Sequence, residues 1–222
     1  MWKELIKIWK KDDLMIQAWG NSFEMLQLSR EMFIQSVNVL RKKSSDKSII
    51  ALKKRDKEIN EFQCEVRRKV MTHFILQKDA TDFANGLILL NIVVDIERVG
   101  DYSKNILDLA ISTHKKFKAE KVSTELKSIE DEVIKRFDQT IEALHSQDSG
   151  VAEELLSTHR QMVSTASDKL VDSILKGNII FKSESKAAAV VLYARYLKRV
   201  GSHLSNIMTT LVNPYDTIGY KK

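Results

Sequence analysis

Two carboxylates spaced four residues apart, Glu97 and Asp101, are the residues whose types and spacing most directly suggest chemistry. On a helix, positions i and i+4 lie on one face with Cβ atoms about 5–6 Å apart. A second polar pair, Asp56 and Asn60, has the same spacing in a segment that otherwise carries apolar residues at helical intervals. Burying carboxylates without partners is costly, so we expect positive charge between the helices that carry these pairs.

Two sources of that positive charge fit the pattern. One is a divalent or iron-type metal ion bound by Asp56, Asn60, Glu97 and Asp101, because hard metal ions prefer carboxylate and amide oxygens. The other is a salt bridge between helices to a neighbouring basic residue. The candidates are Arg67, Arg68, Arg98 and Lys104. The spacing alone does not choose between a metal ion and an ion pair.

No catalytic motif accompanies these carboxylates in the sequence. There is no phosphate-binding glycine loop and no G-x-S-x-G sequence. Glu142 and His145 form a single Glu-x-x-His, whereas a ferritin-like di-iron site needs two such pairs. We therefore expect a protein that is not an enzyme, with a metal-dependent phosphohydrolase as the competing hypothesis.

The composition favours long helices. The 222 residues include one Pro and seven Gly, and 43% are hydrophobic, which argues against β-sandwiches and barrels. In six segments, apolar residues recur every three or four positions, which is the periodicity of a helix with one apolar face. These are residues 12–43, 46–77, 81–114, 122–146, 150–176 and 182–212. The third segment is apolar nearly all round in its first half, so we expect it to lie deepest.

Charge and apolar content place further limits on partners and location. The net charge of +6 is a small excess of 36 basic over 30 acidic residues, which does not indicate a nucleic-acid partner. The longest apolar run, Leu87 to Val94, is far shorter than the about 20 residues of a membrane span. A single cysteine and the absence of an evident signal peptide favour a cytoplasmic protein.

An internal repeat divides the chain. Arg98, Val99 and Gly100 recur 101 positions later as Arg199, Val200 and Gly201, in the third helical segment of each half. The simplest explanation is a duplicated three-helix unit. We predict an all-α fold of two pseudo-symmetric antiparallel three-helix bundles, with one repeat in residues 1–117 and a second, degenerate repeat in residues 118–222.

The motifs resemble those of a known family. The segment D-I-E-R-V-G-D-Y-S-K-N-I at 95–106 is similar to the signature L-E-R-I-G-D-x-x-x-N-I of the PhoU family of phosphate uptake regulators. R-D-K-E-I-N-E at 55–61 resembles the family's second-helix D-x-x-x-N motif, and Asp82 matches an Asp at the start of its third helix. The resemblance implies the six-helix PhoU fold and a regulatory role in phosphate homeostasis. It also implies metal binding, because family members can hold metal clusters through such motifs.

Partners follow from the resemblance alone. It implies a phosphate transporter component and a sensor kinase, and it allows a homodimer and a peripheral contact with the inner face of the membrane. The basic and Trp-containing segment at residues 1–11 is one candidate for that contact. The C-terminal residues 212–220 resemble a PhoU-like subgroup linked with sodium/phosphate cotransport, so a structural adaptor for such a cotransporter is a further alternative.

The second half departs from the family pattern. Lys198 stands in place of the motif Glu, and Ser202 in place of the motif Asp. By sequence alignment, His159 and Val163 replace the second-helix Asp and Asn. We therefore expect any metal site to lie in the first repeat.

Overall fold

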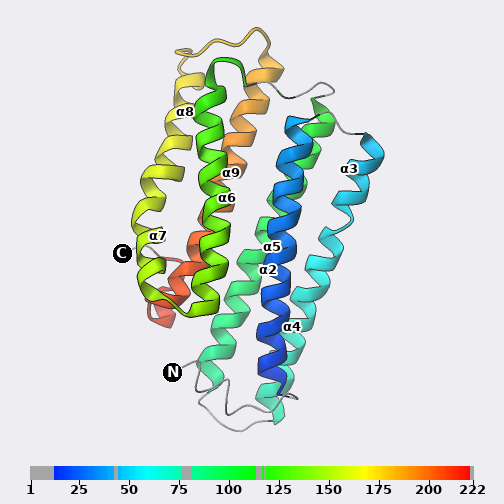
Figure 1. Cartoon of the computed structure of the whole chain (residues 1–222), viewed down its shortest axis with the longest axis vertical. Coiled ribbons are helices and arrows are strands. Elements are labelled where there is room, and N and C mark those ends of the chain that lie inside the picture. Colours follow the sequence, from blue (N-terminus) through cyan, green and yellow to red (C-terminus); the bar gives the residue numbers. More distant parts are fainter. Residues whose placement is uncertain (1–12, 43–44, 77–81, 114–116, 118, 221–222) are drawn as a thin grey trace.

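Long helices packed side by side make up the described part of the chain, and no strand occurs within it (Figure 1). The computed structural model describes residues 13–42, 45–76, 82–113, 117 and 119–220. The first half contains α2 (Leu14–Arg41), α3 (Asp46–Lys53), α4 (Asp56–Leu76) and α5 (Phe83–Ser112). The second contains α6 (Ser123–Ser146), α7 (Ser149–His159), α8 (Ala166–Leu175) and α9 (Glu184–Val212). The predicted fold of two three-helix bundles is confirmed.

Two of the six predicted helices contain an interruption. The second is broken at Lys54 and Arg55, between α3 and α4, where Arg55 N–H donates to the Leu52 carbonyl, three residues back. The fifth predicted helix is continuous in direction but passes through a π-helical turn, Arg160–Thr165, between α7 and α8. A π-helical turn accommodates one extra residue relative to an α-helix.

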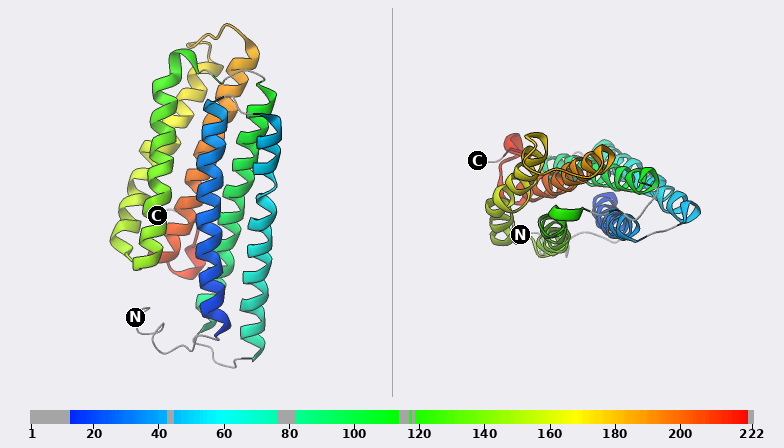
Figure 2. Two further views of the ribbon diagram at one scale, coloured as in Figure 1. Left: turned by 45° about the vertical axis from the view of Figure 1, so that its right-hand side comes forward. Right: turned by 90° about the horizontal axis from the view of Figure 1, so that it is seen from above.

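Helix α5 is the central helix of the bundle. It packs against α2 and α4 of its own half and against α9 of the other half. Seen from above in Figure 2, α2 and α6 lie on one side of a row that contains α9, α5 and α4. This agrees with the expectation that the third helix lies deepest, and it makes the contact of α5 with α9 the main junction between the halves.

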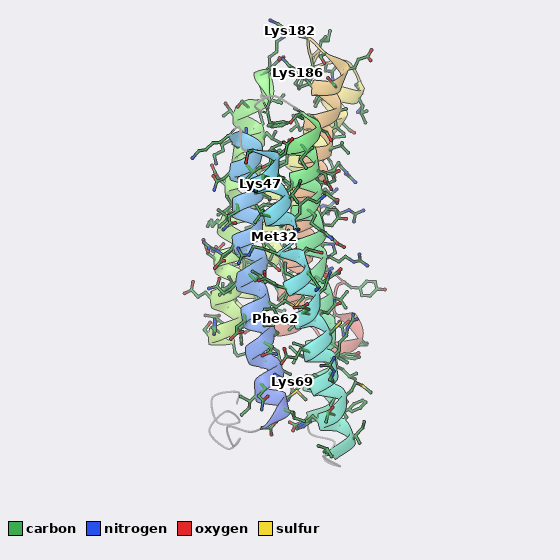
Figure 3. All side chains as sticks on the ribbon, turned by 90° about the vertical axis from the view of Figure 1, so that its right-hand side faces the viewer. Met32, Lys47, Phe62, Lys69, Lys182 and Lys186 are labelled. Carbon is green, nitrogen blue, oxygen red and sulfur yellow. The ribbon has the colours of Figure 1, made fainter. Side chains whose placement is uncertain are left out.

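A continuous hydrophobic core runs through both halves. Met32, near the middle of α2 in Figure 3, is fully buried, whereas Lys182 and Lys186 lie at one end of the bundle and Lys69 towards the other. Asp13 caps α2 by accepting a hydrogen bond from the Met15 amide at 2.7 Å. Within the described residues, no helix has the length and apolar character needed to cross a membrane.

Candidate functional site on α4 and α5

The residues predicted to act together do lie together, at the start of α4 and the middle of α5. Asp56 is the first residue of α4 and is buried, and Asn60 Nδ2 donates to Asp56 Oδ2 at 3.2 Å. Glu97 and Asp101 approach from α5, close enough for both Asp101 and Asp56 to act on the charge of Glu97. We call these four residues the acidic cluster.

Lys104 supplies a positive charge at the centre of the acidic cluster. Its Nζ donates to Asp56 Oδ2 at 2.8 Å and lies 3.0 Å from Asp101 Oδ1, so it joins α4 to α5. Burial tends to lower the pKa of Lys104, but its bonds to Asp56 and Asp101 outweigh burial and raise that pKa above its ordinary value. The lysine is therefore a fully charged ammonium group at neutral pH.

Arg98 adds a second, more exposed cation. Its Nη1 donates to Asp101 Oδ2 at 3.0 Å, and its Nε lies 3.7 Å from Glu97 Oε2. Burial raises the pKa of Glu97, and the neighbouring Asp101 and Asp56 raise it further. Three carboxylates thus face two cations, and Glu97 is the least compensated of the three.

The arrangement does not fit a metal ion while Lys104 is in place. The ammonium group contacts the carboxylates of both Asp56 and Asp101, which are two of the side chains that would hold a metal ion. Among the described residues, no group of three or more His, Cys, Asp or Glu is arranged to hold a metal. Of the two predicted sources of positive charge, the structure contains the ion pair. Metal binding by Asp56, Asn60, Glu97 and Asp101 stays a prediction.

The acidic cluster lies nearer the surface than the apolar pattern suggests. Glu97 and Asp101 continue the line of Leu87, Leu90 and Val94, but that line is not the buried face of α5, since Val94 is 38% exposed. The face of α5 that packs in the core is a neighbouring line. It includes Leu89, Ile92, Ile96 and Val99. The side chains of Glu97 and Asp101 are therefore 18% and 30% exposed, at the rim of the α4–α5 contact.

Gly100 permits the close approach of the two helices beside the acidic cluster. A Cβ atom at this position would lie 3.0 Å from Ile59 Cδ1 and 3.5 Å from Asp56 Oδ1. The repeated Gly201 has the same role in the second half, where a Cβ would lie 3.0 Å from Val163 Cγ1. Close helix packing beside the glycine is therefore present in both repeats.

The contacts of the two glycines correct the alignment of the repeats. His159 lies against Gly201 as Asp56 lies against Gly100, in agreement with the sequence alignment. Val163, however, takes the place of Ile59 and not of Asn60. Ser164 Oγ lies 3.2 Å from His159 Nε2, which matches the contact of Asn60 with Asp56. The extra residue of the π-helical turn shifts this part of the second repeat by one position.

The corresponding region of the second repeat has a different charge arrangement. Lys198, at the position of Glu97, donates to both carboxylate oxygens of Asp168, at 2.7 and 2.6 Å. Arg195 Nη1 also donates to Asp168, at 2.9 Å. Ser202 donates to the Lys198 carbonyl of its own helix. The lysine that stands at the position of Glu97 is therefore compensated by an ion pair with Asp168, which has no counterpart in the acidic cluster.

Three polar contacts between helices were not predicted. Asp95 Oδ1 on α5 lies 2.7 Å from His203 Nδ1 on α9, and this contact joins the two repeats. Asp82, predicted from the family motif, lies 3.1 Å from the buried His73 of α4. Glu130 is buried among three helices. A sequence signal existed for Glu130, because it interrupts the apolar line of α6, but its partners are distant in sequence.

The raised pKa of Glu97 leads to a stability prediction. When a carboxyl group has a higher pKa in the folded state than in the unfolded state, the protein becomes less stable as the pH rises through the range of those two pKa values. Glu97→Gln should therefore stabilise the protein at about pH 7, by less than about 1 kcal/mol because the side chain is partly exposed. Urea unfolding at about pH 7 and about pH 4 should show a gain that shrinks in acid. A gain of the same size at both pH values would contradict this origin.

Comparisons with known proteins bear on this fold and on the first repeat. A PhoU domain family model matches residues 23–110, which include the acidic cluster. PhoU from Pseudomonas aeruginosa has a similar crystal structure, with a TM-score of 0.78 and 18% identity over 91% of this chain and 97% of that one. The phosphate transport system regulatory protein PhoU from Streptococcus pneumoniae is similar with a TM-score of 0.77 and 17% identity, over 89% and 93% of the two chains. Among curated proteins, none matches.

Proposed function

We propose that this chain, whose residues 23–110 match a PhoU domain family model, regulates phosphate uptake and phosphate signalling by binding other proteins. The observation that carries the proposal is the match of the PhoU domain to the segment that holds both carboxylate motifs. The similarity of 91% and 89% of this chain to two PhoU structures supports the fold on which this role depends.

The partners we propose are a phosphate transporter component and a sensor kinase, in the cytoplasm at the inner face of the membrane. The surface best suited to contact them is the rim of α4 and α5, where the partly exposed Glu97 and Asp101 lie. A surface hollow borders Asp101 and Lys104 and is lined mostly by charged side chains. Exposed charges at a rim steer association and set specificity more than they add affinity.

Regulation by binding is favoured over the phosphohydrolase hypothesis by the state of the acidic cluster. A metal-dependent hydrolase needs open coordination positions on a metal ion and an activated nucleophile. Here the carboxylates of Asp56 and Asp101 are engaged by Lys104, and Arg98 engages Asp101 as well. These bonds support a role in shaping a binding surface.

The test is phosphate uptake in the organism that encodes the protein. Deletion of the gene should change phosphate uptake and the phosphate-starvation response at high external phosphate, and the wild-type gene should restore both. Asp101→Lys should fail to restore them, because it reverses charge at the proposed contact surface. Asp131→Lys is the matched control, since Asp131 is an exposed carboxylate on α6.

Two outcomes would contradict the proposal. One is an unchanged phosphate response after deletion. The other is an equal effect of Asp101→Lys and Asp131→Lys when circular dichroism shows both variants to be folded. A response confined to sodium-dependent uptake would instead support the cotransporter-adaptor alternative.

A further inference from the structure

We infer that Lys104 is the resident cation of the first repeat, and that its ammonium group takes the place of a divalent metal ion between Asp56 and Asp101. The inference concerns the binding chemistry of the acidic cluster and does not rest on the proposed role in phosphate regulation. It makes Lys104 the residue that decides whether this cluster binds metal.

The first argument is the geometry of the ammonium group. Lys104 Nζ contacts one oxygen of Asp56 and one of Asp101, at 2.8 and 3.0 Å. A hard divalent ion would use the same oxygens as ligands. The two cations therefore compete for one position, and the lysine has the advantage of being covalently attached beside it.

The second argument is the placement of Lys104 by the fold. It follows Asp101 by three residues on α5, so both side chains lie on the same helix face. Gly100 lets α4 approach closely at this level, which brings the buried Asp56 within reach of the same ammonium group. The position of the cation is thus determined by backbone contacts that do not require metal.

The third argument comes from the second repeat. Ser205, buried on α9, occupies the position that corresponds to Lys104, so the cation is not supplied from there. Lys198 supplies it instead, from a different position, and donates to both oxygens of Asp168. Each repeat therefore neutralises carboxylate at the contact of its second and third helices with a lysine of the third helix.

A latent metal site follows from this arrangement. Asp56 Oδ1 is buried beside Gly100 and has no hydrogen-bond partner in the described part of the chain. Without Lys104, that oxygen, Asp56 Oδ2, the amide of Asn60 and the carboxylates of Glu97 and Asp101 would remain as hard oxygen ligands. Hard oxygen ligands suit Mn²⁺. Because no group of three carboxylates among the described residues is already arranged to hold a metal, these side chains would have to move towards the position that Lys104 vacates.

The experiment measures Mn²⁺ binding to the purified full-length protein after treatment with a chelator, by calorimetry and by thermal unfolding. We expect Lys104→Ala to bind Mn²⁺ at least about ten-fold more tightly than the wild type. Mn²⁺ should also raise the unfolding temperature of Lys104→Ala and leave that of the wild type unchanged, because a ligand stabilises the state that binds it.

Matched variants separate the site from general charge effects. Lys53→Ala removes the cation of an exposed ion pair with Asp108 on the same side of α5 and should gain no Mn²⁺ response. Lys104→Arg retains a cation and should behave like the wild type. Adding Asp101→Asn to Lys104→Ala should abolish the gain.

The inference is wrong if the wild type binds Mn²⁺ as tightly as Lys104→Ala, and in that case the metal prediction made from the sequence would stand. It is equally wrong if removal of Lys104 gives no gain. Lys104→Met, which keeps the apolar stem of the side chain, is the second variant should Lys104→Ala not fold. Because binding is measured on purified protein, failure here is distinct from an unchanged phosphate response in cells.

Discussion

Replacing Glu130 by alanine should lower the free energy of unfolding by about 3–5 kcal/mol, the cost of breaking a buried ion pair by removing one partner. Glu130 is 1% exposed and lies where α6 meets α2 and α9. Its Oε2 accepts hydrogen bonds from Arg41 Nη2 at 2.8 Å and from Tyr193 OH at 2.6 Å. Lys127 donates to Oε1 at 2.8 Å.

The size of this effect comes from the groups left behind. Without Glu130, the Tyr193 hydroxyl would be fully buried without its acceptor, and the Arg41 guanidinium would lose the carboxylate that compensates its partial burial. A buried polar group without a partner retains its full desolvation penalty. Burial raises the pKa of Tyr193, and the Glu130 charge raises it further, so the hydroxyl keeps its proton as a donor.

Urea unfolding of Glu130→Ala, Glu130→Gln and Asp131→Ala measures this effect. Glu130→Gln retains an acceptor for Tyr193 and should lose less than Glu130→Ala. Asp131 contacts the same Lys127 but has a side chain that is 59% exposed, so Asp131→Ala should change stability by no more than about 0.5 kcal/mol. A loss for Glu130→Ala as small as that for Asp131→Ala would show that the buried network contributes little.

The helices and the repeat could be predicted because both depend on local pattern. Apolar residues at helical spacing indicated all six helices, and the recurrence of Arg98-Val99-Gly100 indicated two copies of one unit. The break between α3 and α4 has no such signal. Neither glycine nor proline marks Lys54 and Arg55, and the turn there is formed by backbone bonds over three residues.

The depth of the acidic cluster and the identity of its cation could not be predicted, for a related reason. The first half of α5 is apolar nearly all round. Periodicity therefore could not distinguish the partly exposed helix face that contains Val94 from the buried helix face that contains Ile96. The rotation of α5 decides which face packs against the core. The same rotation decides that Lys104 reaches Asp56, whereas Arg67 and Arg68 point to solvent.

The sequence alignment of the second repeat was wrong by one position after His159, because the feature that causes the shift has no recognisable signal in the residue types. The π-helical turn Arg160–Thr165 inserts one residue into an otherwise regular amphipathic pattern. His159 precedes the π-helical turn and was aligned correctly, whereas Val163 lies within the turn and was not. The contacts with Gly201 and the contact of Ser164 with His159 reveal the offset.

The last prediction concerns cooperativity between the two halves, which the boundary predicted between residues 117 and 118 leaves open. Phe33 of α2 and Phe137 of α6 are fully buried, and their ring centroids are 5.5 Å apart across that boundary. Each should cost about 3–5 kcal/mol when replaced by alanine. The double variant should lose about 0.5–1.5 kcal/mol less than the sum of the single losses, because the two rings stabilise each other.

The tryptophans allow the two halves to be observed separately. All three belong to the first half of the sequence, and Trp19 of α2 packs against the core, so the fluorescence of Trp19 reports on that half, while circular dichroism reports on both. Because the core is continuous, Phe137→Ala in the second half should shift the fluorescence transition as much as the circular dichroism transition. If fluorescence does not respond to Phe137→Ala while circular dichroism shows two transitions, the repeats unfold independently, and the contact of Phe33 with Phe137 does not couple them.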